Sequence, residues 1–232
     1  MAAPVPSIDA LRDLAERLDE ALRELADADQ AEPMARYMKD RFEFLGVKTP
    51  ARRASSKALV AATRRADLDD VVAVVDALRA HPEREFHYVA SDVLRANDRR
   101  LRARDFEHLA RWITTDSWWD TVDALASPTV GTMVRNHPEL AATLDDWVDG
   151  DELWLARTAI IHQLRYGDDT DAERLFRYAL ARARDTDFFI RKGIGWALRQ
   201  YAHHAPDRVR AFVDEHRDRF SPLTIREATK HL

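Results

Sequence analysis

The stretch Trp154–Arg165 (WLARTAIIHQLR) returns about 34 residues later as Phe188–Arg199 (FFIRKGIGWALR), with aromatic, arginine, isoleucine and leucine residues at matching positions. Trp118 lies a similar distance before Trp154, and Phe86 lies about 32 residues before Trp118. Such an interval is typical of two-helix units that each bury an apolar face against the next unit. The sequence therefore predicts an all-α fold, an α-solenoid whose equivalent helices line one concave groove.

Apolar residues recur at helical spacing along most of the chain, and strand-like alternation is almost absent. The spacing predicts helices over Ile8–Ala26, Met34–Phe44, Ala51–Arg65, Asp69–Arg79, Glu83–Ala96, Arg104–Thr114, Ser117–Ala126, Thr129–Asn136, Pro138–Val148, Glu152–Arg165, Asp171–Arg184, Asp187–His203, Pro206–Phe220 and Leu223–His231. No long linker interrupts them. We expect one repeat domain over residues 1–232, in which residues 1–30 form an acidic N-terminal helix and residues 31–232 form the repeats.

Composition excludes several classes of protein. The chain has 232 residues, 46% of them hydrophobic, which is enough for a sizeable core. It has no cysteine, so disulfide frameworks and cysteine-ligated zinc sites are excluded. It has six glycines and no Gly-rich phosphate-binding motif. No apolar run approaches a membrane span and no signal peptide is recognisable, so we expect a cytoplasmic protein with no membrane partner. The composition, rich in alanine, arginine and aspartate, indicates a GC-rich bacterial genome, and DNA binding would associate the protein with the nucleoid.

Charge is unevenly distributed, although the formal net charge is only −5. The first helix is rich in acids, whereas the segment from Arg36 to Arg65 and the segment from Arg95 to Arg104 are rich in arginine and lysine. Either basic cluster alone is explained by a solvated helix face. Two clusters together indicate a basic stripe suited to a nucleic-acid backbone, with the acids segregated elsewhere.

The motif Ser117–Asp123 (SWWDTVD) is the strongest candidate for chemistry. Ser117 followed by Asp120 predicts a helix N-cap with an acidic partner. Trp119 and Asp123 are four residues apart and share one face of that helix. The motif is explained either by an N-capping acid with two core aromatics, or by an electron-rich pocket for a cationic ligand.

Several motifs resemble the AlkD-type DNA alkylation repair glycosylases. They are SWWDTVD at 117–123, WLAR at 154–157, FFIRKGIGWALR at 188–199, YMK at 37–39, FLGVKTP at 44–50, SPL at 221–223 and REATK at 226–230. The resemblance runs from about residue 30 to the C-terminus. It implies a HEAT-like repeat fold that holds duplex DNA in its concave face. It also implies hydrolysis of the N-glycosidic bond of cationic N3- and N7-alkylated purines, such as 3-methyladenine and 7-methylguanine, without a metal or a cofactor.

The resemblance also implies roles for individual residues. Asp123 matches the catalytic carboxylate, and Trp119 and Trp196 match the two aromatics that hold the alkylated nucleotide. The positions expected to contact DNA are Arg157, Tyr37, Lys48, Arg199 and Arg191. Lys48 and Arg191 stand where relatives can carry uncharged residues. We expect a monomer that acts on duplex DNA containing alkylated purines.

The alternative function is a non-catalytic HEAT-like scaffold that binds branched DNA or a protein partner, because the same fold supports both. The Trp119, Asp123 and Trp196 set favours catalysis, since a carboxylate that faces phosphates would weaken DNA binding in a scaffold. His203 and His204 suggest a metal only weakly, because no second group of ligands stands at a supporting spacing.

Overall fold

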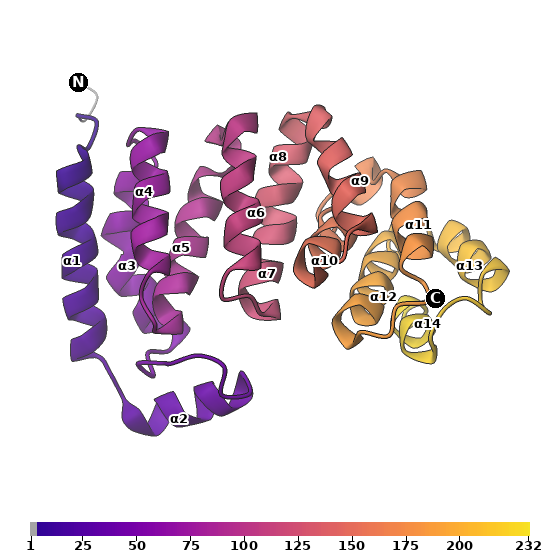
Figure 1. Ribbon diagram of the computed structural model, residues 1–232, viewed down its shortest axis with the longest axis horizontal. Coiled ribbons are helices and arrows are strands. Elements are labelled where there is room, and N and C mark those ends of the chain that lie inside the picture. Colours follow the sequence, from indigo (N-terminus) through magenta and orange to yellow (C-terminus); the bar gives the residue numbers. More distant parts are fainter. Residues whose placement is uncertain (1–3) are drawn as a thin grey trace. The chain divides into compact units, whose positions relative to one another are not determined.

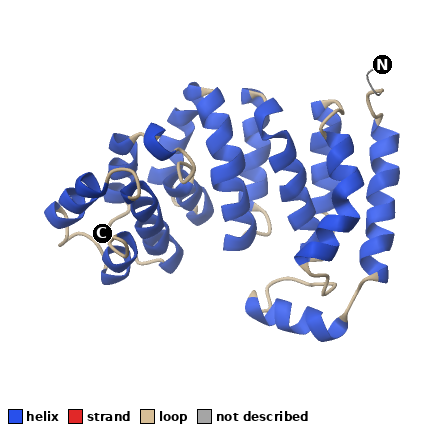
Figure 2. Ribbon diagram, turned by 180° about the vertical axis from the view of Figure 1, so that it is seen from behind, coloured by secondary structure: helices blue, strands red, loops and turns tan. Residues whose placement is uncertain are grey.

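The computed structural model describes residues 4–232. Within this range the chain is helical, and the only strand-like pairing is an isolated bridge between Glu43 and Glu83. Its helices are α1 (Ile8–Glu24), α2 (Ala28–Tyr37), α3 (Thr49–Thr63), α4 (Leu68–Arg79), α5 (Arg84–Asn97), α6 (Phe106–Thr114), α7 (Trp119–Leu125), α8 (Gly131–Asn136), α9 (Ala141–Asp149), α10 (Leu153–Ile161), α11 (Ala172–Ala181), α12 (Phe188–Ala202), α13 (Pro206–Glu215) and α14 (Pro222–Ala228). The predicted all-α fold is confirmed (Figure 2). No helix of the described range combines the length and the apolar character needed to cross a bilayer.

The chain divides into two compact units, one ending at Leu101 and the other beginning at Arg102. In the first unit, α3 and α4 each pack against both α1 and α5 (Figure 1). The buried face of α1 consists of Leu11, Leu18 and Leu22, whose spacing is that of an amphipathic helix. Burial of each leucine contributes roughly 1.5–3 kcal/mol, so this face holds α1 on the stack while its acids stay in solvent.

The loop before α3 is held by a buried carboxylate. Glu85, fully buried at the start of α5, accepts hydrogen bonds from the backbone N–H groups of Leu45 (3.1 Å), Gly46 (2.9 Å) and Val47 (3.0 Å). Gly46 has φ +87°, and a Cβ atom there would lie 2.1 Å from the carbonyl oxygen of Asp27. The loop therefore needs both a glycine and an acid, and it fixes the chain immediately before Lys48.

In the second unit, α10 is the central helix. It packs against α6, α7, α9 and α12, and seven of its nine residues are buried. A helix that is apolar on nearly every side belongs in a core. The next helix, α12, also packs closely against α14. A Cβ atom at Gly195 on α12 would stand only 2.5 Å from Cβ of Glu227 on α14.

The repeat interval seen in the sequence reappears in the hydrogen bonds. In the first unit Asn97 Nδ2 donates to Thr63 Oγ1 at 3.1 Å, and in the second unit Arg157 donates to Asp123; each pair is 34 residues apart. Equivalent positions of successive helix pairs thus lie side by side, which is the packing of an α-solenoid.

Several helices end earlier than predicted, such as α10 at Ile161 and α13 at Glu215, and two further differences concern α2 and α7. The helix predicted over Met34–Phe44 is α2, which begins at Ala28 and ends at Tyr37. The predicted N-cap at Ser117 is wrong: α7 begins after Trp118, and the Ser117 hydroxyl donates back to the carbonyl of Ile113 at the end of α6. A serine hydroxyl between two helices can hydrogen-bond to the backbone of either one, and here it bonds to the preceding helix.

A π-helical turn, Ala126–Val130, joins α7 to α8 and contains Pro128. Proline cannot donate the backbone hydrogen bond that a regular helix requires, and π-turns inside helices often lie at functional sites. All five residues of the turn are buried. The turn ends the helix that carries Asp123 within one turn of this carboxylate.

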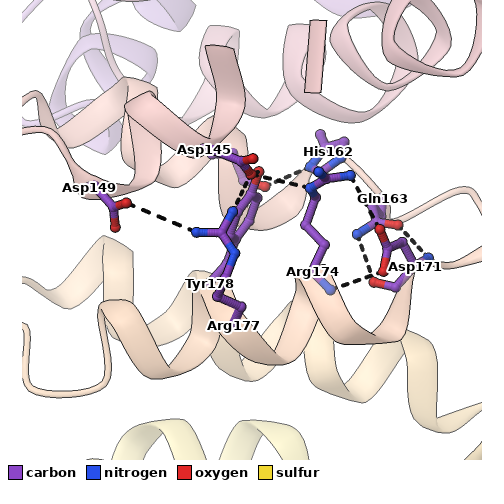
Figure 3. A network of polar contacts seen from close by, with 9 residues as sticks. Asp145, Asp149, His162, Gln163, Asp171, Arg174, Arg177 and Tyr178 are labelled. Carbon is purple, nitrogen blue, oxygen red and sulfur yellow. Dashed lines mark hydrogen bonds and ion pairs between the residues drawn. The ribbon is translucent and has the colours of Figure 1, made fainter. Parts of the chain in front are cut away.

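A polar network ties α9, α10 and α11 together (Figure 3). Asp145 on α9 accepts hydrogen bonds from Tyr178 Oη (2.6 Å) and Arg174 Nε (3.3 Å). Burial alone would raise the pKa of Asp145, but the hydrogen bonds from Tyr178 and Arg174 outweigh it and hold this pKa below its usual value. Gln163 exchanges hydrogen bonds with the backbone of Asp171, which caps α11. The network therefore joins α9 to α11, and through Gln163 it joins the segment just after α10 to the start of α11.

Candidate active site

The candidate site is built on α7 and α10. Asp123 on α7 receives two hydrogen bonds from Arg157 on α10, one from Nε to Oδ1 (2.8 Å) and one from Nη2 to Oδ2 (2.7 Å). This is the bidentate geometry that a guanidinium and a carboxylate prefer. The Arg157 side chain is 5% exposed and the Asp123 side chain 18% exposed. The pair thus presents the carboxylate, and not the guanidinium, to the surface.

Arg157 is fixed by a third partner on α12. Its Nη1 donates to the backbone carbonyl of Phe189. Gly193 lies one turn further along α12, and a Cβ atom there would stand 3.1 Å from Arg157 Nη1. A glycine at this position leaves the room that the guanidinium occupies. One arginine therefore connects α7, α10 and α12.

Three aromatic side chains pack together beside this arginine. Trp118 lies with its ring centroid 4.9 Å from Phe189 and 5.7 Å from Trp154, and Trp154 lies 5.1 Å from Phe189. Edge-to-face and tilted pairs at such distances stabilise by about 0.5–1.5 kcal/mol each beyond their burial. The three rings come from the start of α7, α10 and α12, so they fix the spacing of the helices that carry the site.

Trp119 and Trp196 are each partly exposed. Trp119 begins α7 and stands one helical turn before Asp123, on the same face of the helix. Trp196 stands three residues after Gly193 on α12, the helix that packs on the other side of α10. Neither indole is sealed in the core. Their convergence on one bound nucleotide stays a prediction.

Comparison with known proteins bears on this arrangement. A sequence model of the family described as DNA alkylation repair enzyme matches residues 18–232. The chain belongs to the DNA alkylation repair enzyme family. A solved structure described as a predicted DNA alkylation repair enzyme from Enterococcus faecalis is similar, with a TM-score of 0.84 and 30% sequence identity over 89% of this chain and 96% of that one. No curated protein matches the sequence significantly. Membership of the DNA alkylation repair enzyme family supports a role in the repair of alkylation damage, with DNA as partner.

Arg191 and Arg199 are both predicted to contact DNA. In the structure each donates a hydrogen bond to another residue of the second unit. Arg191 Nε donates to the carbonyl of Asp185 at 2.7 Å. Arg199 Nη1 donates to Glu227 Oε2 at 2.6 Å, and this hydrogen bond lowers the pKa of Glu227. Both arginines are partly exposed. Their contact with DNA stays a prediction, and it requires that a phosphate share or replace these partners.

Tyr37 and Lys48, the other two predicted DNA contacts, belong to the first unit. Tyr37 ends α2 and is 68% exposed, a large apolar surface in solvent. Lys48 is exposed and precedes α3 at the N-cap position, directly after the loop that Glu85 holds. Both side chains are therefore accessible to a ligand, and their contact with DNA stays a prediction.

The basic clusters separate into structural and accessible arginines. Arg100 donates to the carbonyl of Thr63, the last residue of α3 (2.9 Å), and to that of Ala66 just beyond it (2.6 Å), so it holds the helix terminus. Arg52 is buried and paired with Asp92 at 3.3 Å. By contrast, Lys57, Arg64 and Arg95 are exposed. Only part of the basic stripe predicted from sequence is therefore available to a ligand.

Two functional features were not predicted from sequence. One is the Phe189 carbonyl, which accepts from Arg157, and the other is Gly193, which gives the arginine room. An aromatic residue recurs at intervals of about 35 residues, at Trp118, Trp154 and Phe189. This recurrence is the signal that could have identified the position of the Phe189 carbonyl. Gly193 in the middle of a helical pattern is the signal for the second, because glycine inside a helix is costly unless something approaches closely.

Among residues 4–232, no group of three histidine, aspartate or glutamate side chains lies close enough to hold a metal ion. His204 Nδ1 lies 2.9 Å from Asp168 Oδ1 at the surface, and His203 stacks with His231. These histidines therefore form separate pairs.

Proposed function

We propose that this protein is a monofunctional DNA glycosylase that hydrolyses the N-glycosidic bond of cationic N3- and N7-alkylated purines in duplex DNA. The proposal rests on membership of the DNA alkylation repair enzyme family together with the chemistry available at Asp123. Its substrates would include 3-methyladenine, 7-methylguanine and bulkier purine adducts of the same charge.

The leaving base needs no protonation by the enzyme. Alkylation at N3 or N7 gives the purine a formal positive charge, so the base leaves neutral and no general acid is required. Sugar hydrolases use a pair of carboxyl groups because their leaving groups must be protonated. Here one carboxylate is enough, and its task is to stabilise the oxocarbenium-like sugar and to orient the attacking water.

Asp123 fits this task in charge and exposure. Two unit charges about 4 Å apart interact by about 4 kcal/mol at an effective dielectric of 20. At about 1.4 kcal/mol per factor of ten, that corresponds to roughly a thousandfold in rate. The positive charge of Arg157 reduces this field, so the figure is an upper value for Asp123 in its pair.

Arg157 would then act as a positioning residue. It takes up one acceptor position on each carboxylate oxygen, and each oxygen has a second. The remaining positions are available to a water or to the sugar. Because Arg157 is itself held by the Phe189 carbonyl, the carboxylate is pre-oriented before DNA binds. The DNA-backbone contact that the resemblance implied for Arg157 would require this buried guanidinium to become accessible.

Trp119 and Trp196 would provide lesion recognition. The face of an indole attracts a cation by about 0.5–2 kcal/mol and has no such preference for a neutral base. Two partly exposed indoles on α7 and α12 would therefore favour alkylated purines over normal ones. Selectivity would come from charge and not from hydrogen bonds to the base.

The observation that carries the proposal is the bidentate pair in which Arg157 holds a partly exposed Asp123. The test is release of 3-methyladenine and 7-methylguanine from alkylated duplex DNA by the purified protein. Asp123→Asn should abolish release with little change in DNA affinity. Asp120→Asn on the same helix is the matched control and should retain release. A wild-type protein that binds DNA but releases no base would instead support the scaffold function.

A further inference from the structure

The π-helical turn that follows α7 contains two buried hydroxyl groups without a hydrogen-bond partner. Ser127 and Thr129 are both buried, and neither hydroxyl forms a hydrogen bond with another group of residues 4–232. The turn, Ala126–Val130, begins three residues after Asp123. The candidate catalytic carboxylate is thus followed at once by a buried stretch of chain that carries unpaired polar groups.

A third hydroxyl of this kind lies on the helix that packs against the turn. Thr158, directly after Arg157 on α10, is fully buried, and its hydroxyl also has no partner within the described part of the chain. Gly131 follows the turn and lies so close to α10 that a Cβ atom there would stand 2.4 Å from the carbonyl oxygen of His162. Thr158 and His162 are four residues apart, so Thr158 lies on the side of α10 that faces the turn. We refer to Ser127, Thr129 and Thr158 as the hydroxyl cluster.

Other buried hydroxyls in the helices of this protein bond to a carbonyl of the preceding turn. Thr63 donates to the carbonyl of Val60 at 2.9 Å, and Ser91 donates to that of His87 at 3.0 Å. This is the usual local alternative for serine and threonine inside a helix. The hydroxyl cluster does not use it. Since most buried polar side-chain atoms in proteins bond either to protein or to ordered water, the cluster indicates a bound ligand.

Water suits the hydroxyl cluster in chemistry and in number. A hydroxyl group donates one hydrogen bond and can accept others, and a water molecule does the same. A buried water makes about three hydrogen bonds, usually to groups that would otherwise be unsatisfied. The three hydroxyls carry no charge, which favours a neutral ligand over an ion, because a buried ion needs compensating charge.

We propose that the hydroxyl cluster binds an ordered water between the π-turn and α10, and that this water positions Asp123 for the reaction. The second part rests on the proposed glycosylase function. Ser127 stands one turn after Asp123, and Thr158 is the neighbour of Arg157 in the chain. A water that joins the turn to α10 would therefore fix α7 and α10 relative to each other beside the ion pair. The members of the cluster are positioning residues, and because they are buried they should not touch DNA.

The test compares wild type with Thr158→Val, which replaces only the hydroxyl by a methyl group. Water-oxygen magnetic relaxation dispersion counts long-lived internal waters and should find one fewer in the variant. The melting temperature should fall by about 2–4 °C, the effect of one net hydrogen bond at this size. Single-turnover release of 7-methylguanine at saturating enzyme should slow roughly fivefold, because Asp123 shifts by a few tenths of an ångström. Affinity for an unmodified duplex should stay unchanged.

Two further variants separate the water site from a general loss of stability. Thr158→Ser keeps the hydroxyl and should restore both the water count and the rate. Thr63→Val on α3 is the matched control, because Thr63 is equally buried but its hydroxyl already donates to Val60. It should lower the melting temperature and leave the water count and the rate unchanged. Ser127→Ala, a smaller change in the same cluster, provides the same measurements if Thr158→Val does not fold.

The outcomes that contradict the proposal are distinct. An unchanged water count in Thr158→Val overturns it, whatever the rate, and an equal or higher melting temperature would then show that the hydroxyl was unpaired. A lost water with an unchanged rate overturns the positioning role. If the wild type releases no alkylated base, the glycosylase proposal fails, while the water count still decides whether the site exists.

Discussion

Gly193 on α12 lies directly against the guanidinium of Arg157 on α10. A Cβ atom added to Gly193 would stand 3.1 Å from Arg157 Nη1. Such a distance is shorter than nearly all contacts that real Cβ atoms make. The guanidinium has little room to retreat, because its other nitrogens bond to Asp123 and Nη1 itself bonds to Phe189. A glycine on one helix thus decides where the candidate catalytic carboxylate of another helix is held.

Gly193→Ala should therefore slow base release without weakening DNA binding. Displacement of a reacting group by 1 Å can cost about a hundredfold in rate, so a shift of a few tenths of an ångström should cost roughly fivefold. Alanine favours helix, so stability should not fall. Single-turnover rates and duplex affinity measure the two effects separately. An unchanged rate at saturating enzyme would show that Arg157 accommodates the methyl group.

Gly195→Ala, two residues further on, should act on stability. Its Cβ atom would stand 2.5 Å from Cβ of Glu227 and 2.9 Å from the carbonyl oxygen of Thr224. Both belong to α14, and neither is the end of a flexible side chain. Overpacking of this kind costs about 1–3 kcal/mol, which exceeds the gain of about 1 kcal/mol in helix propensity. The variant should melt several degrees lower than wild type, since 1 kcal/mol corresponds to about 2–4 °C at this size.

The matched control for that variant is Gly150→Ala after α9. There a Cβ atom would meet the carbonyl oxygen of Asp146 at 3.2 Å, and φ is −78°. This milder contact lies away from α12 and α14, so the melting temperature should change less. If both variants melt alike, the close approach of α12 and α14 contributes nothing measurable.

Arg157→Lys tests whether geometry or charge matters at the site. Lysine keeps the positive charge but cannot make two parallel hydrogen bonds to Asp123 while also donating to Phe189. Base release should fall by about tenfold to a hundredfold, in line with a carboxylate that is less well oriented. Duplex affinity should hardly change, because the Arg157 side chain is 5% exposed. A large loss of affinity at an unchanged rate would instead place Arg157 at a DNA phosphate.

Arg157→Ala should lower the stability of the fold, whereas Arg157→Lys should mainly lower the rate of base release. Removal of one partner of a buried ion pair leaves the other uncompensated and costs about 3–5 kcal/mol. Asp123 is itself partly exposed, so solvent should lower this cost. A comparison of melting temperatures for the two variants, with Arg12→Ala on α1 as an exposed control, separates the structural contribution from the catalytic one.

The repeat explains how much of this site could be predicted from sequence. Asp123 and Arg157 are 34 residues apart, so their adjacency follows from the interval that relates Trp154–Arg165 to Phe188–Arg199. The role of each arginine could not be predicted in the same way. Arg100 and Lys57 look alike in a basic cluster and both are exposed, yet the Arg100 guanidinium donates to the carbonyls of Thr63 and Ala66 and so holds the end of α3. A long flexible side chain finds its partner through tertiary contacts that local sequence does not specify.

The capping motif shows the same limit at short range. Ser117 and Asp120 have the spacing of a helix N-cap and its acidic partner, but Ser117 bonds to Ile113 in the preceding helix. Both options lie within reach of one hydroxyl, and the short connection between α6 and α7 decides between them. The face shared by Trp119 and Asp123 survives this change, because their separation of four residues does not depend on where the helix begins.

His162 gives a prediction about pH and stability. It is buried on the C-terminal side of α10, and Nδ1 lies 2.6 Å from the carbonyl oxygen of Ala159. Burial disfavours the charged ring and lowers the pKa of His162 from 6.5 to about 4. The folded protein therefore keeps His162 neutral at a pH where the unfolded chain binds a proton. Its contribution is fully present above pH 6.5 and is lost as the pH falls toward 4.

The size of that effect follows from the shift. At about 1.4 kcal/mol per unit, His162 accounts for a loss of roughly 3 kcal/mol between pH 6.5 and pH 4. Denaturant unfolding at several pH values measures it, and His162→Gln should flatten the slope over this range, because glutamine does not titrate. Asp145, whose pKa lies below its usual value, acts at lower pH, so the two contributions fall in different windows. Equal slopes for wild type and His162→Gln would mean that the ring accepts a proton without leaving its buried position.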